Sequence, residues 1–135
     1  NVYGHDKTIS PKKNVLGFLS QLMREDKDIT LYNNGDDLRD YMHIIDICRA
    51  LKIVIDEGDV NTIYNIASGE SLPFRKILEI VRDKLNSQSK FIPIPTPRFN
   101  QLTIPKNCSL NVDKLKSLGF TPSIDLHEGL QSLCQ

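Results

Sequence analysis

Segments with the apolar spacing of a helix alternate along this chain with short runs of strand-like sequence. Helical spacing, with apolar side chains gathered on one stripe, is found at residues 14–25, 47–57 and 74–86. Extended, strand-like runs are found at residues 29–32, 39–44 and 62–67. The alternation predicts a mixed α/β fold. The three or four short strands are too few and too scattered to form a doubly wound sheet by themselves.

Turn and cap residues predict where several of these segments begin and end. Residues 33–35 (Asn-Asn-Gly) predict a turn after the first strand, because Asn and Gly accept positive φ. Asp46 is expected to cap the helix over residues 47–57, and Pro73 suits the first turn of the helix that follows it. The helix over residues 47–57 carries apolar residues on more than one side, so we expect it to be buried on more than one face.

The second half of the chain reads as irregular structure followed by short helices. Residues 91–105 contain four prolines, which predicts an extended, irregular run along a surface. Two short helices are expected over residues 112–118 and 126–133. Neither an internal repeat nor a second domain is evident, and 135 residues suffice for one compact domain.

Composition excludes some classes of function. The 17 Lys and Arg residues balance the 17 Asp and Glu residues, so an anionic ligand must be met by a few placed cations rather than by a basic surface. No apolar run approaches the roughly 20 residues that cross a bilayer, and the start does not resemble a signal peptide. The cysteines are far apart and show no metal-ligand spacing, which predicts reduced thiols in a cytoplasmic protein: Cys48, Cys108 and Cys134. The chain opens on Asn1 without an initiator methionine, as if cut from a longer protein.

Taken without a family in mind, the sequence offers little chemistry. It has no Ser–His–Asp arrangement, carboxylate pair or metal cluster, and no Gly-rich phosphate loop follows a strand. His43 and Asp46 lie close together at a strand-to-helix junction, where a structural polar contact is the favoured interpretation over catalysis.

Four stretches, taken in order, nevertheless resemble the motifs of one family. Residues 1–4 (NVYG) resemble an Asn-x-Tyr-Gly turn. Residues 31–46 (LYNNGDDLRDYMHIID) resemble a Tyr-Gly-x-Gly stretch followed by Arg-Asp-(Tyr/Phe)-x-x-Val-x-Asp. Residues 64–69 (YNIASG) resemble Tyr-Asn-Ile-Gly-x-Gly, and residues 110–130 resemble a Leu-Gly-(Trp/Phe)-x-Pro and Glu-Gly-Leu ending. This order is similar to the carboxy-terminal part of the extended short-chain dehydrogenase/reductases, the NAD-dependent nucleotide-sugar epimerases and dehydratases.

The resemblance implies that residues 1–135 form the substrate-binding region of such a Rossmann-type enzyme. The family's Gly-rich dinucleotide-binding domain and its catalytic Tyr-x-x-x-Lys pair precede the part that this chain resembles. Tyr3 and Lys7 match that pair in spacing only, because Tyr3 belongs to the turn motif and Gly4 is a poor helix former. We therefore expect no catalytic residue, no cofactor site and no metal site in this chain, and no activity from it alone.

Site residues carried over from the family all serve substrate binding: Asn1, Asn14, Val15, Tyr32, Arg39 and Arg98. Arg39 is expected to grip the diphosphate, since a guanidinium offers paired donors to phosphate oxygens, and Arg98 is the candidate for a second phosphate arginine. Asn14 has an alternative as an exposed helix-start residue, and Tyr32 as a half-buried strand tyrosine. Asp40 and Asp46 are expected to be structural, Asp40 by fixing Arg39.

The enzyme implied by the resemblance is a homodimer that uses bound NAD or NADP. It epimerises, dehydrates, decarboxylates or reduces a nucleoside-diphosphate sugar through a keto intermediate. The alternative is a stand-alone, non-catalytic module that binds a nucleotide-sugar or mediates assembly. A Gly-rich strand–loop–helix encoded upstream would indicate the enzyme, whereas a start codon at this point would indicate the module.

Overall fold

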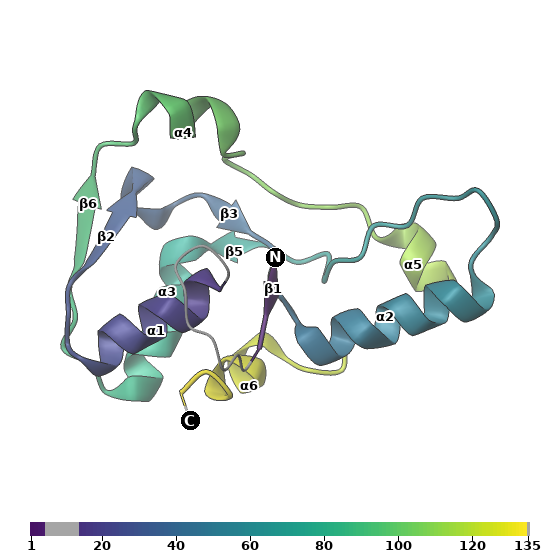
Figure 1. The fold of residues 1–135 in the computed structure, drawn as a ribbon, viewed down its shortest axis with the longest axis horizontal. Helices are drawn as coiled ribbons and strands as arrows, with labels where there is room; N and C mark the ends of the chain where they lie inside the picture. The colour runs from purple at the N-terminus through teal and green to yellow at the C-terminus, as the bar shows by residue number, and fades with distance from the viewer. Residues whose placement is uncertain (5–13, 135) are drawn as a thin grey trace.

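The computed structural model describes residues 1–4 and 14–134, and it confirms the mixed α/β fold. The strands are β1 (Val2–Tyr3), β2 (Ile29–Tyr32), β3 (Leu38–Arg39), β4 (Met42–His43), β5 (Leu72–Pro73) and β6 (Phe91–Ile94). The helices are α1 (Val15–Arg24), the 3-10 turn η1 (Asn33–Gly35), α2 (Ile44–Glu57), α3 (Phe74–Leu85), α4 (Arg98–Thr103), α5 (Asp113–Ser117) and α6 (Leu126–Gln131). Figure 1 shows α2 and α5 extending to one side of the molecule, away from the pair formed by β2 and β6.

Within the described residues, the strands pair in three two-stranded sheets rather than in one continuous sheet. β1 pairs in parallel with β4, and β2 pairs in parallel with β6, so that Ile29 lies opposite Phe91. β3 pairs antiparallel with β5, which places Arg39 opposite Leu72. These short pairings hold segments together that lie far apart in the sequence, and they are too small to form a core by themselves.

The main core lies where α1 packs against β2 and α3, and where α3 packs against α6 (Figure 1). Its most deeply buried side chains are Tyr3, Leu16, Met23, Ile29, Leu31, Ile77, Leu78, Val81 and Leu130. A second, smaller cluster joins α2 to α5 through Met42, Ala50, Leu115 and Phe120. The apolar spacing in the sequence therefore predicted the buried faces of α1 and α3 correctly, because each presents one stripe to the core.

The turn at residues 33–35 is also confirmed. Asn33 and Asn34 have φ of 45° and 55°, and Gly35 has φ of 76°, so three consecutive residues adopt the left-handed region. A side chain at Gly35 would also meet Arg75, because a Cβ there would lie 2.9 Å from the Cβ of Arg75. This turn ends β2 and redirects the chain into β3.

The start of α2 corrects one prediction. The helix begins at Ile44 rather than Ile47, and its cap is His43, whose Nδ1 accepts a hydrogen bond from the Ile45 N–H at 3.3 Å. Asp46 therefore lies inside the first turn instead of at the cap. A carboxylate there still suits the positive end of the helix dipole.

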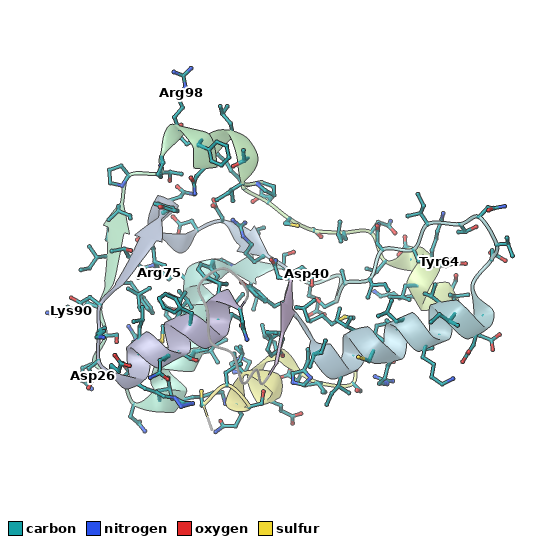
Figure 2. All side chains as sticks on the ribbon, in the orientation of Figure 1. Asp26, Asp40, Tyr64, Arg75, Lys90 and Arg98 are labelled. Atoms are coloured by element: carbon teal, nitrogen blue, oxygen red, sulfur yellow. The ribbon has the colours of Figure 1, made fainter. Side chains whose placement is uncertain are left out.

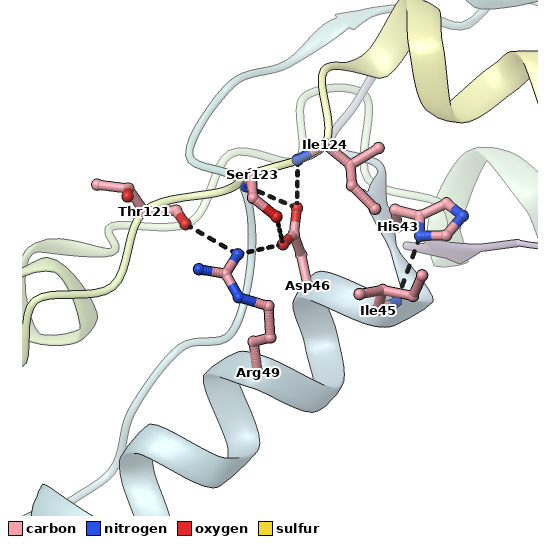
Figure 3. A network of polar contacts seen from close by, with 7 residues as sticks. All are labelled: His43, Ile45, Asp46, Arg49, Thr121, Ser123 and Ile124. Carbon is pink, nitrogen blue, oxygen red and sulfur yellow. Dashed lines mark hydrogen bonds and ion pairs between the residues drawn. The ribbon is translucent and has the colours of Figure 1, made fainter.

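Asp46 is instead the centre of a buried network that ties α2 to the segment before α6 (Figure 3). Its carboxylate accepts the backbone N–H groups of Ser123 and Ile124, each at 2.9 Å, and the Ser123 hydroxyl at 2.8 Å. Arg49 donates to the same carboxylate at 2.6 Å and reaches the Thr121 carbonyl. The network offers the Asp46 carboxylate several donors, from Ser123 and Ile124 and from Arg49 of the same helix, where a cap would offer only the backbone N–H groups of the first turn.

Residues 62–67, predicted as a strand, have no ladder partner among the described residues and remain irregular. Ile63 in this stretch is 83% exposed, whereas a strand preference describes a side chain packed on a half-buried pleated surface. Isolated polar contacts fix residues 62–67 instead of a strand ladder. In one of them, the Asn65 side-chain amide donates to the Asn111 carbonyl at 2.9 Å.

The proline-containing segment is more regular than predicted. It contains β6 and the six-residue helix α4, in addition to extended residues. Pro93 lies within β6, opposite Leu31. A proline can occupy this position because both strands of a two-stranded sheet are edges, where a missing N–H costs no ladder bond.

The prediction that α2 is buried on more than one face is wrong. One side, with Ala50, packs on the smaller core cluster. The opposite side exposes four residues at helical spacing, which we call the outer stripe: Ile44, Cys48, Leu51 and Ile55. Ile55 is 81% exposed. No helix in the described ranges is long and apolar enough to cross a bilayer.

Candidate functional site

A pocket of about 940 Å³ opens between the sheet formed by β2 and β6, the turn η1 and the segment around α4. Its lining combines residues from α1, β2 and β3 with residues 95–106, so segments distant in sequence meet at one place. The volume lies in the range of small-molecule sites in proteins. Of the six residues predicted from the sequence, four line this pocket: Asn1, Val15, Tyr32 and Arg39.

Arg39 enters the pocket from β3, and its guanidinium is held by neighbouring backbone. Its Nη1 donates to the carbonyl oxygens of Leu38 at 2.8 Å and Pro105 at 3.0 Å, while Nη2 lies 3.4 Å from an Asp37 carboxylate oxygen. The side chain is 18% exposed. These contacts orient the guanidinium and use three of its five N–H groups, so two donors remain for an anion.

Asp37 is a pocket residue that the sequence did not single out. One carboxylate oxygen accepts the Asn33 side-chain amide at 2.8 Å, and the other faces Arg39. Its backbone carbonyl accepts the Phe74 N–H at 3.0 Å. Asp37 is thus fixed at both its side chain and its backbone, and it connects the turn η1 with the arginine.

A correction concerns Asp40, which was expected to fix Arg39. Its buried carboxylate instead accepts the Ser68 N–H at 3.1 Å, the Ser68 hydroxyl at 2.8 Å and the Gly69 N–H at 2.9 Å. Asp40 follows Arg39 on the other side of the chain, because successive side chains of an extended segment point in opposite directions. It is structural, as predicted, but it anchors the loop at residues 67–69.

The second cation of the pocket is Lys106 rather than Arg98. Lys106 lines the pocket, whereas Arg98 is exposed and does not. Figure 2 shows Arg98 pointing outward from the outer end of α4, away from the rest of the molecule. The only sequence cue for Lys106 was a cation directly after a proline, which does not distinguish a pocket lysine from a surface one.

The remaining predicted residues differ in their surroundings. Asn1 donates through its side-chain amide to the Asp40 carbonyl at 3.1 Å and borders the pocket. Asn14 does not line the pocket. Its side chain accepts the Gly17 N–H at 2.9 Å and donates to the Gly4 carbonyl at 3.3 Å, so its amide caps α1.

One wall of the pocket is aromatic. Tyr32, 39% exposed, stands at the end of β2, and Tyr41 and Phe74 lie deeper, with stacked rings whose centroids are 6.4 Å apart. Burial raises the pKa of Tyr41 to about 12, an effect that the charge of Arg39 opposes. The Tyr41 hydroxyl therefore stays protonated at physiological pH and is available as a hydrogen-bond donor rather than as a base.

Tyr3 does not look like a catalytic residue. Its ring is 2% exposed, and its hydroxyl lies against α6 so closely that a Cβ at Gly129 would be 2.0 Å from it. Burial, with the nearby charges of Asp125 and Asp46, raises the pKa of Tyr3 to about 12. Lys7 lies outside the described residues. Within those residues, no group of three or more His, Cys, Asp or Glu side chains is placed to hold a metal ion.

Residues 1–67 match the model of the NAD dependent epimerase/dehydratase family. A dTDP-glucose 4,6-dehydratase of an Actinoplanes species is 26% identical over 121 residues, which cover 89% of this chain and 37% of that protein. The chain spans between 37% and 40% of the length of three curated relatives that it matches.

Two solved structures share the fold. A UDP-glucose 4-epimerase of Thermotoga maritima, solved with UDP-glucose, superposes with a TM-score of 0.87 at 22% identity, covering 98% of this chain and 42% of that one. A dTDP-glucose 4,6-dehydratase of Bacillus anthracis, solved with NAD, gives a TM-score of 0.81 at 23% identity over 100% of this chain and 41% of that one. The family match, together with the curated relatives, shows that the chain belongs to the NAD-dependent epimerase/dehydratase family, and the solved structures show that it shares their fold.

Proposed function

We propose that this chain is the nucleotide-sugar-binding portion of an enzyme that uses NAD or NADP to epimerise, dehydrate, decarboxylate or reduce a nucleoside-diphosphate sugar. The observation that carries the proposal is the 940 Å³ pocket, in which Asn1, Val15, Tyr32 and Arg39 converge. These four residues come from four separate segments. All four were assigned to the same ligand from separate sequence motifs. If those assignments were unfounded, the four residues would not be expected to line one pocket.

The charged side of the pocket suits a diphosphate. Arg39 presents a planar guanidinium with paired donors, and Lys106 adds a mobile point charge from the opposite segment. Two placed cations are what a chain of zero net charge needs in order to bind an anion without a basic surface.

The aromatic side suits the rest of the ligand. Tyr32 is exposed enough to lie against a flat base, since base–aromatic stacking is worth about 1–3 kcal/mol per base. Asn1 and Asn33 provide amides near the same pocket, and amides discriminate hydroxyl and carbonyl patterns of sugars and bases. Val15 offers apolar contact at the start of α1.

The sequence of this chain lacks the Gly-rich motif that binds a dinucleotide cofactor. Its seven glycines never occur in the Gly-x-Gly-x-x-Gly spacing that lets a backbone approach a pyrophosphate at a helix start. We therefore propose that the part of the enzyme corresponding to the unmatched length of the relatives supplies the cofactor and the catalytic groups. The outer stripe of α2 is an apolar surface suited to pack against that part.

The proposal is tested by calorimetric titration of the chain with UDP, dTDP and GDP, with their glucose conjugates, and with the matching nucleosides. At least one nucleoside diphosphate and its sugar conjugate are expected to bind. The nucleoside alone should bind at least about tenfold more weakly, because it lacks the charge-assisted contacts to Arg39. If none of the diphosphates or conjugates binds, the proposed function is wrong.

A pocket-filling variant locates the binding. Val15→Trp places a large ring at the pocket wall and should abolish the heat of binding, while Gln21→Trp puts the same ring on α1 outside the lining. Both variants should keep cooperative thermal unfolding. Equal loss of binding in both would show that the ligand does not occupy this pocket.

A further inference from the structure

We infer that Asp37 sets the charge selectivity of the pocket, favouring the sugar conjugate over the free nucleoside diphosphate. The inference rests on the proposed function and assigns a specificity role within the same site. Three charged side chains line the pocket among the described residues: Asp37, Arg39 and Lys106. The carboxylate therefore reduces the charge facing an anionic ligand from about two positive charges to one.

Asp37 does not serve as the main support of Arg39. The Asp37–Arg39 contact is 3.4 Å, longer than the 2.7–2.9 Å usual for a charge-assisted hydrogen bond. Two carbonyl oxygens, those of Leu38 and Pro105, hold the guanidinium at 2.8 and 3.0 Å without it. Removing the charge of Asp37 should therefore leave Arg39 in place.

Asp37 also cannot easily turn away from a ligand. Its second oxygen is engaged by Asn33 at 2.8 Å, and its backbone carbonyl is bonded to Phe74. A phosphate that accepts hydrogen bonds from Arg39 must lie within about 6 to 9 Å of the Asp37 carboxylate, given the 3.4 Å contact and an ordinary hydrogen bond. Repulsion over that distance is only partly screened, because the Debye length is about 8 Å at physiological salt.

The Asp37 carboxylate repels the free nucleoside diphosphate more strongly than the sugar conjugate. A terminal phosphate loses its second proton near pH 6, so at pH 8 a free nucleoside diphosphate carries about one more negative charge than its sugar conjugate. In the conjugate, the diphosphate is esterified at both ends and has no such proton to lose. A fixed carboxylate beside the arginine therefore penalises the free nucleotide more than the conjugate.

The test compares Asp37→Asn with Asp36→Asn at pH 8. Asn keeps the shape of Asp37 and one acceptor oxygen for the Asn33 amide, and its NH2 group replaces the oxygen that lies 3.4 Å from Arg39. Asp36 is the adjacent exposed residue outside the pocket lining, and Asp36→Asn loses the same formal charge. Dissociation constants are measured for UDP, UDP-glucose, dTDP and dTDP-glucose. In Asp37→Asn both classes should bind more tightly, and the ratio of free-nucleotide to conjugate Kd should fall by about threefold or more.

The Asp36→Asn variant should leave that ratio within about 1.5-fold of wild type, because its charge lies outside the pocket. An unchanged ratio in Asp37→Asn, weaker binding of both ligands, or an equal shift in both variants would overturn the inference. If Asp37→Asn unfolds, Asp37→Ser provides the same charge removal, and melting temperatures report which variant is usable. Absence of binding by the wild-type chain would instead show that the proposed function itself is wrong.

Discussion

The Arg39 guanidinium is held against the pocket wall by two backbone carbonyls before any ligand binds. This arrangement favours recognition, since part of the cost of ordering a long side chain is met by the fold rather than by the ligand. It also gives Arg39 a structural role, because the bond to Pro105 joins β3 to the segment after α4. The two roles make different predictions for the same substitution.

Arg39→Ala is expected to weaken nucleoside-diphosphate binding by about 10- to 100-fold, the loss of a charge-assisted contact worth roughly 1.5–3 kcal/mol. Arg39→Lys should recover only part of this affinity, because an ammonium lacks the paired planar donors. The matched control is Arg98→Ala, which removes an exposed arginine outside the pocket. Calorimetry and thermal unfolding on all three variants separate the roles: a lower melting temperature with unchanged affinity would leave Arg39 purely structural.

Asp46 makes a prediction about acid stability. Burial alone raises the pKa of this carboxyl, but hydrogen bonds from Ile124, Ser123 and Arg49 outweigh burial and lower it below the ordinary value. A folded-state pKa below that of the unfolded chain means that the unfolded chain binds the proton more tightly. The stabilisation is therefore complete above about pH 4 and is lost as the pH falls toward the lowered pKa.

Asp46→Asn should lower the free energy of unfolding by about 2–4 kcal/mol at pH 7, because an amide cannot accept all of these donors in a buried site. The difference from wild type should shrink as the pH is lowered to about 3. Asp56→Asn, on the exposed part of the same helix, is the control and should change little at any pH. Urea denaturation over this pH range makes the measurement, and a difference that does not vary with pH would contradict the network role.

At the scale of the element, α2 shows the limit of predicting the buried faces of a helix from apolar spacing alone. The sequence showed apolar residues on more than one side of the helix, and the structure uses one side for the core and leaves the outer stripe exposed. Periodicity reports which residues share a face. It does not report whether this chain supplies a partner for that face.

The outer stripe should make the isolated chain associate. We expect light scattering to detect oligomers at tens of micromolar, and an apolar dye to bind. The double variant Leu51→Lys and Ile55→Lys should reduce both signals, because it places two charges on the stripe. Gln88→Lys with Ser117→Lys adds the same charge at exposed positions elsewhere. If the isolated chain is a monomer and binds no dye, the outer stripe does not drive association.

Local pattern predicted some elements well and others poorly. α1 and α3 followed from one apolar stripe each, and the turn at residues 33–35 followed from Asn and Gly. The predicted strand at residues 62–67 failed because a strand depends on a neighbouring strand, which local sequence does not reveal. For the same reason β6 was missed: Pro93 argued against a strand, and only the pairing with β2 makes that position an edge.

At the scale of the whole molecule, the pocket depends on contacts that no local motif contains. Arg39 and Tyr32 were found from their motifs, whereas Lys106 and Asp37 became visible only when residues 95–106 were folded over β2 and β3. Arg98, the first residue of α4, lies in the same stretch yet points outward and does not line the pocket. A ligand in this pocket would bridge segments spread between Asn1 and Lys106 and should therefore stabilise the fold that joins them.

This bridging gives a final prediction that separates substrate from cofactor. A ligand that binds only the folded state at 100 times its Kd stabilises it by about 2.7 kcal/mol. For a domain of this size, that free energy corresponds to a rise in melting temperature on the order of 10 °C. The nucleoside diphosphate that binds in calorimetry should produce this rise, and Val15→Trp should remove it.

NAD and NADP, at millimolar concentration, should leave the melting temperature of the same chain unchanged, because no Gly-rich turn is present to receive a pyrophosphate at a helix start. The adenosine diphosphate moiety of NAD makes this a demanding control, since it carries a base, a ribose and a diphosphate of its own. Micromolar binding of NAD that Val15→Trp leaves intact would reveal a cofactor site elsewhere in the chain. NAD binding that Val15→Trp abolishes would instead show that the pocket accepts dinucleotides, and that its specificity for nucleotide-sugars is not built into these residues.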